Sequence, residues 1–372
     1  MSARLKIGIA GAGLLGRLLA WRLSRMGHAV SVFDPAPDAH PRFDGKQAAA
    51  FSAAGMLSPL AESANAGTCV AALGVRSLVL WRELVAQLRD EPFHAQRGSL
   101  LIAHAGDLGT ALRMLARLHE VPKGLQAPQL LDRDQLSRME PALHGVAHAW
   151  LLPDEGQIDP PQTLQAMHSE ASREGAQWHW NQQVLDVSPA ALTMADGTRR
   201  DFDWVFDVRG VGARPRSTKG PDHGFTIKLR GVRGETVWLH APGHGLTRPV
   251  RLLHPRHHVY LVPRPDDVVV VGATEIESED RSNISLRSAV ELMAAAHSVM
   301  PALAEARILR TDTNLRPALP DNEPRIETVP GRVRINGLFR HGWLIAPALV
   351  QDALAACKLS AVAPTPAAEA SA

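Results

Sequence analysis

The chain has 372 residues, of which 45% are hydrophobic and 21% charged, and its formal net charge at pH 7 is +2. This length predicts two intertwined domains with large buried cores, and the balanced charge argues against a nucleic-acid-binding protein, which would normally carry a concentrated basic face. No uninterrupted apolar stretch is long enough to span a bilayer, and the two cysteines, Cys69 and Cys357, are too few and too scattered for a disulfide framework or a cysteine-based metal site.

The N-terminal segment could be mistaken for an export signal, because basic residues lead into an apolar run. Arg17 and Arg22 interrupt that run, so we expect a protein that is not exported. Together with the sparse cysteines, this favours a reducing, cytoplasmic location.

The same segment predicts a strand–helix–strand unit that binds a dinucleotide. Residues 5–10 form a β-like run, residues 14–26 carry leucines at helical spacing, and residues 28–33 read as a second strand. The sequence GAGLLG at 11–16 is a GxGxxG pattern, whose glycines permit a tight turn, let a pyrophosphate approach the backbone, and let the helix pack on the strand. Asp34 is placed to accept hydrogen bonds from a ribose diol. The fingerprint does not choose between NAD and FAD.

The rest of the chain turns from helices to sheet and back. We expect helices at 78–88 and 108–118, strands at 229–239, 257–264 and 267–274 with a hairpin connection at 263–267, and helices at 285–300 and 347–359. Parallel-sheet material at the front and antiparallel material in the middle favour a nucleotide-binding domain that is interrupted by a second domain. The histidine-rich HPRHH at 254–258 reads as a polar hairpin edge rather than a metal site.

Six ordered segments carry a family resemblance. They are AAAFSAAGML (48–57), DEGQIDP (154–160), YLVPR (260–264), VGAT (271–274), LRP followed by PD (315–321) and GLFRHGWLIAP (337–347). This set resembles the D-amino-acid oxidase and glycine oxidase family over nearly the whole chain, and is most similar to the glycine oxidases of the thiamine pathway. The alanine-rich segment suits such a protein, because a flat flavin ring stacked against backbone tolerates Ala and Gly but little bulk.

The resemblance implies noncovalent FAD and an α/β fold, with a Rossmann-like FAD-binding domain on a central parallel sheet. A smaller α+β substrate domain on an antiparallel sheet is interleaved with it. It assigns 1–84, 146–226 and 311–360 to the FAD-binding domain, 85–145 and 227–310 to the substrate-binding domain, and 361–372 to a disordered tail. The residues that it places against FAD are Gly11, Gly13, Leu14, Leu15, Gly16, Asp34, Pro35, Ala49, Ala50, Ala54, Gly55, Met56, Val184, Leu338, Phe339, His341, Gly342, Trp343 and Leu344.

An amino-acid oxidase needs orientation more than acid–base groups, so we expect no acid–base residue. It must grip the substrate carboxylate, which a bidentate guanidinium does best. By resemblance, Arg316 falls on the carboxylate-binding arginine and Arg340 on a second, substrate- or flavin-proximal one. Tyr260, the only tyrosine, falls on a position whose hydroxyl reaches the carboxylate. A structural ion pair for Arg316 and a packed aromatic role for Tyr260 stay open.

The run NGLFRHGWLIAP at 336–347 is apolar and rich in glycine, yet it carries Arg340 and His341. We interpret it as a segment that wraps the reactive end of the flavin, with apolar side chains excluding water and Arg340 supplying a counter-charge. The next helix is expected to begin near Pro347 and to direct its N-terminus at the pyrimidine end of the ring.

Several positions depart from the family pattern. His341 and Trp343 replace smaller or amide residues, so the pocket wall is expected to differ in size, and Asp34 replaces the more frequent Glu. Glu275 could approach the substrate amine or face solvent. No cysteine lies near Arg316, where sarcosine oxidases of this superfamily attach flavin, and this is why FAD is expected to be noncovalent.

The predicted activity is oxidation of glycine or another small amine or D-amino acid, with hydride transfer from Cα to flavin N5. The imine would give glyoxylate and ammonia, and O2 would return as hydrogen peroxide. The resemblance also implies a role in making the thiazole of thiamine and a homo-oligomer such as a tetramer. From the charge, the residue spacing and the apolar stretches we expect no nucleic acid, metal or stable membrane association. A quinone-linked dehydrogenase, a tRNA-modifying flavoprotein and a non-catalytic flavin scaffold stay open, as does the choice among glycine, sarcosine, short D-amino acids and aminophosphonates.

Overall fold

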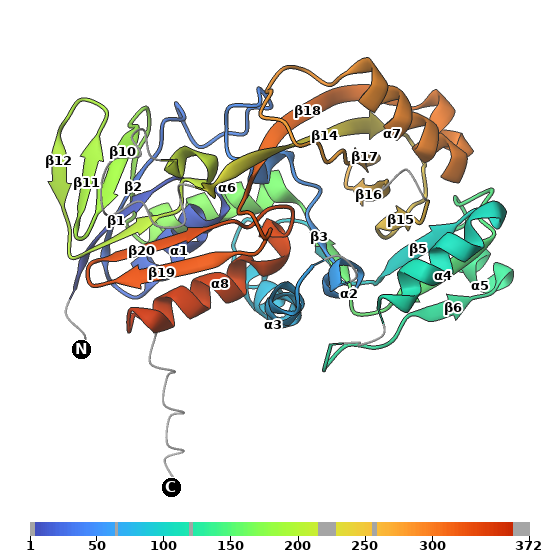
Figure 1. Cartoon of the computed structure of the whole chain (residues 1–372), viewed down its shortest axis with the longest axis horizontal. Coiled ribbons are helices and arrows are strands. Elements are labelled where there is room, and N and C mark those ends of the chain that lie inside the picture. Colours follow the sequence, from blue (N-terminus) through green and yellow to red (C-terminus); the bar gives the residue numbers. More distant parts are fainter. Residues whose placement is uncertain (1–3, 64–65, 119–121, 215–227, 255–258, 360–372) are drawn as a thin grey trace, which may run out of the picture.

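Two sheets lie side by side along the long axis of the molecule (Figure 1). The computed structural model describes residues 4–63, 66–118, 122–214, 228–254 and 259–359. The predicted tail at 361–372 and the histidine-rich stretch from 255 to 258 lie outside these ranges.

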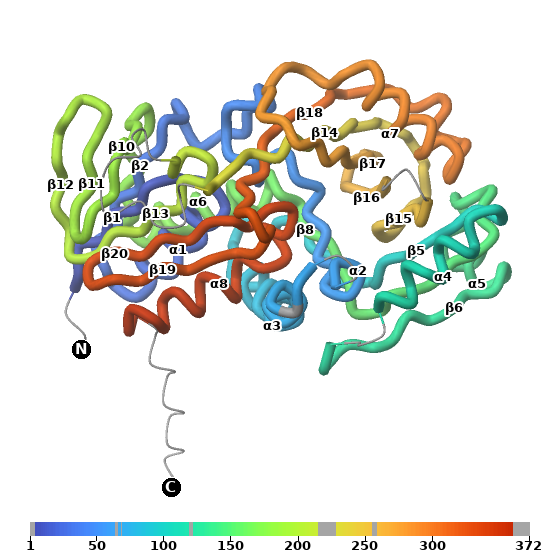
Figure 2. The backbone as a smooth tube through the Cα atoms, viewed as in Figure 1, coloured from blue at the N-terminus to red at the C-terminus, as the bar shows by residue number. Residues whose placement is uncertain are grey.

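The first sheet has six strands and is built around β1 (Lys6–Ala10). Neighbouring strands run parallel except for the antiparallel pair at one edge, so the predicted central parallel sheet is confirmed. Figure 2 shows the blue N-terminal and red C-terminal parts of the chain meeting in this half. The order is β19 (Arg325–Val329), β20 (Arg332–Asn336), β13 (Trp204–Asp207), β1, β2 (Ala29–Phe33) and β9 (Gln177–His179).

Both faces of this sheet are covered, and this explains why its central strands β1, β2 and β13 are mainly apolar. Ile7 and Ile9 pack toward the helices, whereas Ala10 and Phe33 pack toward a small antiparallel sheet. Helices α1 (Leu14–Arg25) and α8 (Gly342–Ala356) lie on one face, and α6 (Pro160–Arg173) and α3 (Thr68–Val85) pack on these helices. The small sheet on the other face consists of β10 (Val184–Ser188), β11 (Ala191–Met194) and β12 (Arg199–Asp201).

Within the described residues the second sheet has eight strands, and its neighbouring strands run antiparallel except for β15 and β5, which are parallel. Its core lies under α7 (Leu286–Val299), with α5 (Arg133–Met139) contributing Leu136, while α4 (Leu108–Ala116) packs near β5. The order is β18 (Arg307–Ala318), β14 (Arg230–His240), β17 (Val268–Gly272), β16 (Tyr260–Arg264), β15 (Val250–Leu252), β5 (Ser99–Ala103), β7 (His148–Leu152) and β6 (Gln129–Leu131). The α/β architecture with a second, mainly antiparallel unit is therefore confirmed.

Short elements join the two halves. A three-stranded sheet of β3 (Met56–Leu57), β8 (Gly156–Ile158) and β4 (His94–Ala95) lies at the junction, next to α2 (Pro59–Ser63) (Figure 1). The chain crosses this junction several times, so residues far apart in sequence meet there. The predicted domain boundaries themselves stay a prediction.

Most predicted elements have counterparts in the structure, with shifted ends. Helix α3 begins ten residues before the predicted start at 78, and α4 ends two residues before the predicted end at 118. The predicted hairpin joins β16 to β17, and its Asp266 and Asp267 adopt φ values of 61° and 57°. Aspartate tolerates this left-handed conformation better than most residues, which suits a tight hairpin.

Candidate active site

One cavity of about 1710 Å³ runs from the GxGxxG turn in the first half to the antiparallel sheet in the second. It exceeds the roughly 300–1,000 Å³ of a typical small-ligand site, so a dinucleotide and a small substrate fit together. Its walls come from segments spread over the chain, which include 11–15, 33–37, 48–56, 208–212, 314–317 and 338–344.

The glycines of the turn leave a cradle for phosphates. Gly11 has φ +106°, and a Cβ there would lie 2.8 Å from the Val208 carbonyl oxygen. A Cβ on Gly16 would lie 1.9 Å from the Gly11 carbonyl oxygen, so this glycine lets α1 pack on the turn and does not line the cavity. The Asp34 carboxylate accepts from the Ala12 N–H at 2.6 Å and the Ala36 N–H at 2.8 Å, and its remaining lone pairs suit ribose hydroxyls.

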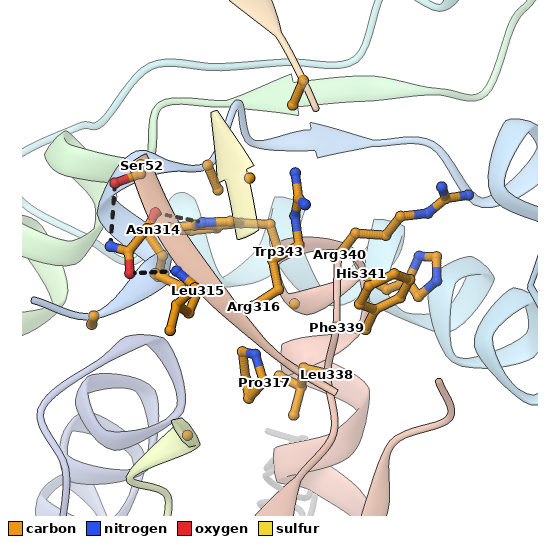
Figure 3. Close-up of a pocket in the computed structure, with 18 of the residues that line it drawn as sticks. Ser52, Asn314, Leu315, Arg316, Pro317, Leu338, Phe339, Arg340, His341 and Trp343 are labelled. Carbon is orange, nitrogen blue, oxygen red and sulfur yellow. Dashed lines mark hydrogen bonds between the residues drawn. The ribbon is translucent and has the colours of Figure 1, made fainter. Parts of the chain in front are cut away.

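The small-residue segment 48–56 follows the cavity as a 3₁₀ turn and then an extended strand. Side chains from other elements hold this segment in place. Trp343 Nε1 donates to the Ala50 carbonyl at 3.1 Å, and Asn314 Nδ2 donates to Ser52 Oγ at 3.4 Å (Figure 3). A Cβ on Gly55 would lie 2.1 Å from the Ile158 carbonyl oxygen. Alanine and glycine therefore leave a flat wall, as a stacked ring requires.

Arg316 reaches the cavity from β18 (Figure 3). The guanidinium lies over Gly234 of the neighbouring strand β14, where a Cβ would come within 2.4 Å of its Cζ. Nη1 donates to the Arg233 carbonyl at 3.3 Å, and within the described ranges no carboxylate forms an ion pair with Arg316. Burial lowers its pKa from the ordinary arginine value. The carboxylate of an incoming substrate would offset this effect by pairing with the cation.

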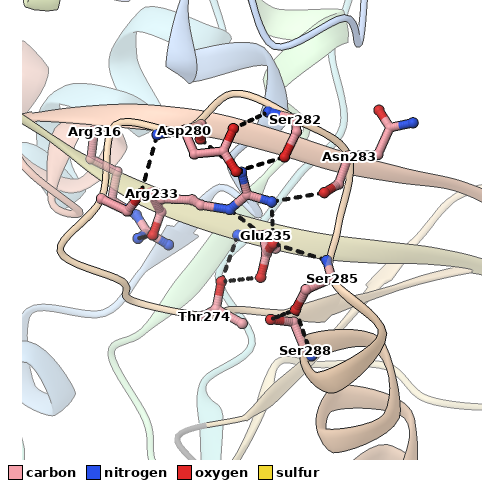
Figure 4. Close-up of polar contacts among 10 residues, drawn as sticks. Arg233, Glu235, Thr274, Asp280, Ser282, Asn283, Ser285, Ser288 and Arg316 are labelled. Carbon is pink, nitrogen blue, oxygen red and sulfur yellow. Dashed lines mark hydrogen bonds and ion pairs between the residues drawn. The ribbon is translucent and has the colours of Figure 1, made fainter.

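A buried polar network holds the backbone beneath Arg316 (Figure 4). The Arg233 guanidinium donates to Glu235 at 2.6 Å and 2.9 Å, to the Asp280 carbonyl at 2.7 Å and to the Asn283 carbonyl at 2.8 Å. Thr274 Oγ donates to the other Glu235 oxygen at 3.0 Å. Sequence reasoning missed this network, because its members come from β14 and from the loop after β17.

Tyr260 lies on β16, opposite Gly272 of β17. A Cβ on Gly272 would lie 2.6 Å from the Tyr260 hydroxyl oxygen, so glycine makes room for the ring. Burial raises the pKa of Tyr260 above its ordinary value. The phenol therefore stays protonated at neutral pH and can donate a hydrogen bond into the cavity.

Arg340 is already engaged by two carboxylates. Its guanidinium lies 3.0 Å from Glu62 and 3.2 Å from Glu275, and its side chain is 30% exposed. Glu62 also lies 2.7 Å from Arg251 and 3.3 Å from Nδ1 of His341. Sequence reasoning missed Glu62 and Arg251, because PLAES reads as an ordinary short helix and nothing local links positions 62 and 251.

Helix α8 begins at Gly342, with His341 as its N-cap, so the prediction of a start near Pro347 was wrong. Pro347 lies inside the helix and has no N–H for the Trp343 carbonyl. That carbonyl instead accepts a hydrogen bond from Trp81 Nε1 at 2.6 Å. The N-terminal end of α8 borders the cavity through residues 342–344, in the orientation that favours negative charge there.

All the residues predicted to bind FAD or substrate line this one cavity, except Gly16. Their individual roles stay predictions. In the part of the chain that the structure describes, no group of three or more His, Cys, Asp or Glu side chains is arranged to hold a metal. No described helix combines the length and apolar character needed to cross a membrane.

The chain is similar to known proteins over most of its length. The sequence model of a family described as FAD dependent oxidoreductase matches residues 6–353. A protein of Rhizobium etli, provisionally named thiamine biosynthesis oxidoreductase ThiO, is 35% identical over 350 residues, covering 94% of this chain and 95% of its own length. Glycine oxidase of Bacillus licheniformis is 29% identical over 91% of this chain and 89% of its own. The crystal structure of glycine oxidase from Geobacillus kaustophilus has the same fold, with a TM-score of 0.78 at 22% identity over 97% of this chain and 96% of its own.

Proposed function

Since the chain belongs to the FAD dependent oxidoreductase family, we propose that it oxidises glycine or a similarly small amino acid, with noncovalent FAD and O2 as the electron acceptor. The prediction of FAD as the cofactor is confirmed by the family match. The observation that carries the substrate proposal is Arg316, a cation with no carboxylate partner among the described residues, in the same cavity as the dinucleotide fingerprint.

The residues present fit FAD. The cradle at Gly11, the carboxylate of Asp34 and the flat wall at 48–56 would hold its pyrophosphate, ribose and ring, respectively. When bound, FAD supplies the acceptor for the hydride that leaves the substrate Cα.

The protein's own contribution is to hold and orient the substrate. Arg316 would bind the carboxylate in a bidentate manner, with the Tyr260 hydroxyl as a further donor. Apolar side chains at 338–344 keep water away from the reacting atoms. Because the leaving hydride needs the electron pair of a neutral amine, turnover should rise with pH until the amine is deprotonated, and a flat alkaline profile would contradict this mechanism.

The product would be an imine that hydrolyses to glyoxylate and ammonia, with hydrogen peroxide formed from O2. The name of the Rhizobium etli relative and that of the Bacillus licheniformis enzyme support this reaction and a role in supplying the imine for the thiazole of thiamine.

The test is an anaerobic titration of the purified holoenzyme with glycine, sarcosine and short D-amino acids, in which bleaching of the flavin absorption reports substrate oxidation. Aerobic assays for peroxide then identify O2 as the acceptor. Arg316→Ala should cost about 2–5 kcal/mol of transition-state binding, as for loss of a buried charge partner. Arg307→Ala is the matched control, since Arg307 lies at the far end of the same strand and its side chain is 76% exposed. Full activity of Arg316→Ala on glycine would refute the assignment.

A further inference from the structure

A buried carboxylate gathers positive charge at the substrate end of the cavity. Glu62, in α2, is 8% exposed and lines the same cavity as Arg316. One of its oxygens lies 2.7 Å from Arg251, and the other lies 3.0 Å from Arg340 and 3.3 Å from His341. The three contacts come from β15 and from the segment before α8, which the fold brings to the end of α2.

The carboxylate is held in its ionised form. Burial alone would raise the pKa of Glu62, but Arg251, Arg340 and His341 outweigh burial and hold the pKa well below its usual range. Its charge is therefore permanent at neutral pH.

This carboxylate offsets the charge of Arg340. The guanidinium of Arg340 has Glu62 on one side and Glu275 on the other, at 3.0 Å and 3.2 Å. Glu62 is the stronger partner, because it is buried whereas the Glu275 side chain is 46% exposed and screened by water. Arg340 is thus a poor partner for a second anion.

The charges at this end can be counted. Among the guanidinium and carboxylate groups named here, the three cations Arg251, Arg316 and Arg340 face the two anions Glu62 and Glu275, which leaves one net positive charge. Among the described residues Arg316 is the member of this group without a carboxylate partner. One substrate carboxylate neutralises the site, whereas a second anionic group would be left without a partner in a partly buried space.

We infer that Glu62 determines substrate charge: by pairing with both Arg340 and Arg251 it restricts the site to amines with a single carboxylate and rejects those with a second carboxylate or a phosphonate. This inference rests on the proposed function. Exclusion by an uncompensated charge is a common source of specificity, since it penalises the wrong ligand without weakening the right one.

The experiment compares Glu62→Gln, which removes the charge, with Glu62→Asp, which keeps it. Two ratios are measured on holoenzyme: kcat/KM for iminodiacetate over that for N-methylglycine, and affinity for malonate over that for acetate, from the flavin absorption change on binding. Glu62→Gln should raise both ratios about tenfold or more, as expected for one added unit of positive charge near the anion. Glu62→Asp should stay near the wild type.

A second variant covers the case in which Glu62→Gln fails to fold. Glu275→Gln removes the exposed partner of Arg340 and should shift both ratios in the same direction by a smaller factor. Glu277→Gln is the control, because Glu277 is 67% exposed and pairs with Arg230 outside the cavity. It should leave both ratios unchanged.

The outcomes separate the inference from the function on which it rests. If glycine bleaches the flavin and neither Glu62→Gln nor Glu275→Gln raises the ratios, the inference fails and the proposed function stands. If glycine does not bleach the flavin but the malonate-to-acetate ratio still rises, the proposed function fails while the charge-selecting role of Glu62 holds. Equal shifts for Glu62→Asp and Glu62→Gln would also overturn the inference, because they would reflect shape rather than charge.

Discussion

Two glycines make room for the two side chains that are proposed to grip the substrate carboxylate. The Arg316 guanidinium lies over Gly234, and the Tyr260 ring lies over Gly272. Each pair crosses two neighbouring antiparallel strands, so the missing side chain on one strand provides the space for a large side chain on the next. The positions of Arg316 and Tyr260 therefore depend on the absence of a side chain at Gly234 and Gly272.

Gly234→Ala should displace Arg316 without unfolding the protein. The added Cβ would come within 2.4 Å of the guanidinium, and the flexible end of a long side chain can move away at little cost. We expect KM for glycine to rise by about tenfold or more, since each 1.4 kcal/mol of lost binding is a factor of ten. Steady-state kinetics and thermal unfolding measure the two effects.

The control for this substitution is Gly106→Ala, where an added Cβ would meet nothing within 4 Å. It should leave KM and the melting temperature unchanged. A Gly234→Ala variant with wild-type KM would contradict this prediction, because either the guanidinium is not displaced or it does not bind the substrate carboxylate.

At the residue scale, residues that belong to a recognisable local pattern could be placed in the cavity from the sequence. Asp34 follows a strand at the expected distance from the glycines, and Arg316 lies beside Pro317 in a recognisable segment; both line the cavity. Glu62 was missed because its significance comes from partners at positions 251 and 340. A lone glutamate in a short helix usually faces solvent, so only the fold reveals its burial.

At the scale of elements, α3 and α8 are joined by an unusual hydrogen bond. Pro347 inside α8 leaves the Trp343 carbonyl without its helical donor, and Trp81 Nε1 of α3 donates to that carbonyl at 2.6 Å. The two indole rings also stack, with centroids 5.5 Å apart. The helical pattern of the sequence predicted a start near Pro347, whereas the helix begins at Gly342. The tertiary donor explains why proline is tolerated five residues further in.

Trp81→Phe should destabilise the protein by about 1–3 kcal/mol beyond its loss of packing, because the carbonyl is buried and would lose its donor. Pro347→Ala adds an N–H that can serve the same carbonyl. The effect of Trp81→Phe should therefore be smaller in the Pro347→Ala background, with a coupling of about 1 kcal/mol in a double-mutant cycle measured by denaturant unfolding.

A cycle that pairs Pro347→Ala with Trp150→Phe provides the comparison. Trp150 is 7% exposed and belongs to a different core, so no coupling is expected. If Trp81→Phe has the same effect on the free energy of unfolding with and without Pro347, the indole N–H adds no stability beyond the packing of the ring.

A second element-scale feature is the packing of α6 against two tryptophans. The His168 ring lies with its centroid 4.5 Å from that of Trp178 and 5.9 Å from that of Trp180. Burial, with a smaller contribution from Arg17, lowers the pKa of His168 from 6.5 to about 4. The folded state therefore favours the neutral ring.

The sign of the resulting pH dependence follows from linkage. A histidine whose folded pKa is depressed contributes its full stability above pH 6.5, and loses it as pH falls through about 4. His168 is partly exposed, so we expect a discounted effect: His168→Phe should reduce by roughly 1–2 kcal/mol the free energy of unfolding that the protein loses on acidification. Denaturant unfolding at several pH values measures it, with the exposed His297→Phe as control. Identical slopes for wild type and His168→Phe would contradict the shift.

At the scale of the whole molecule, the chain returns to the first sheet after long excursions. Strand β13 pairs with β1 across almost two hundred residues, and β20 then pairs with β13. The order of patterns along the sequence predicted this interleaving, because parallel-type strands stand at the front and a helix closes the chain. It could not predict which strands meet, since register and order depend on contacts that no local pattern encodes.

Because the same interleaving lines the cavity with residues from Gly11 to Leu344, FAD bound there would link distant parts of the chain. Neither Cys69 nor Cys357 lines it, so acid precipitation should leave the yellow colour in the supernatant. Returning FAD to the apoprotein should then raise the free energy of unfolding by about 2.7 kcal/mol when free FAD is 100 times its Kd. Thermal unfolding at increasing FAD concentration should give a steadily rising melting temperature, whereas equal concentrations of NAD should leave the melting temperature unchanged. A melting temperature that does not change with FAD concentration would mean that the cavity walls are equally stable without FAD. A yellow pellet after acid precipitation would mean that FAD is bound covalently.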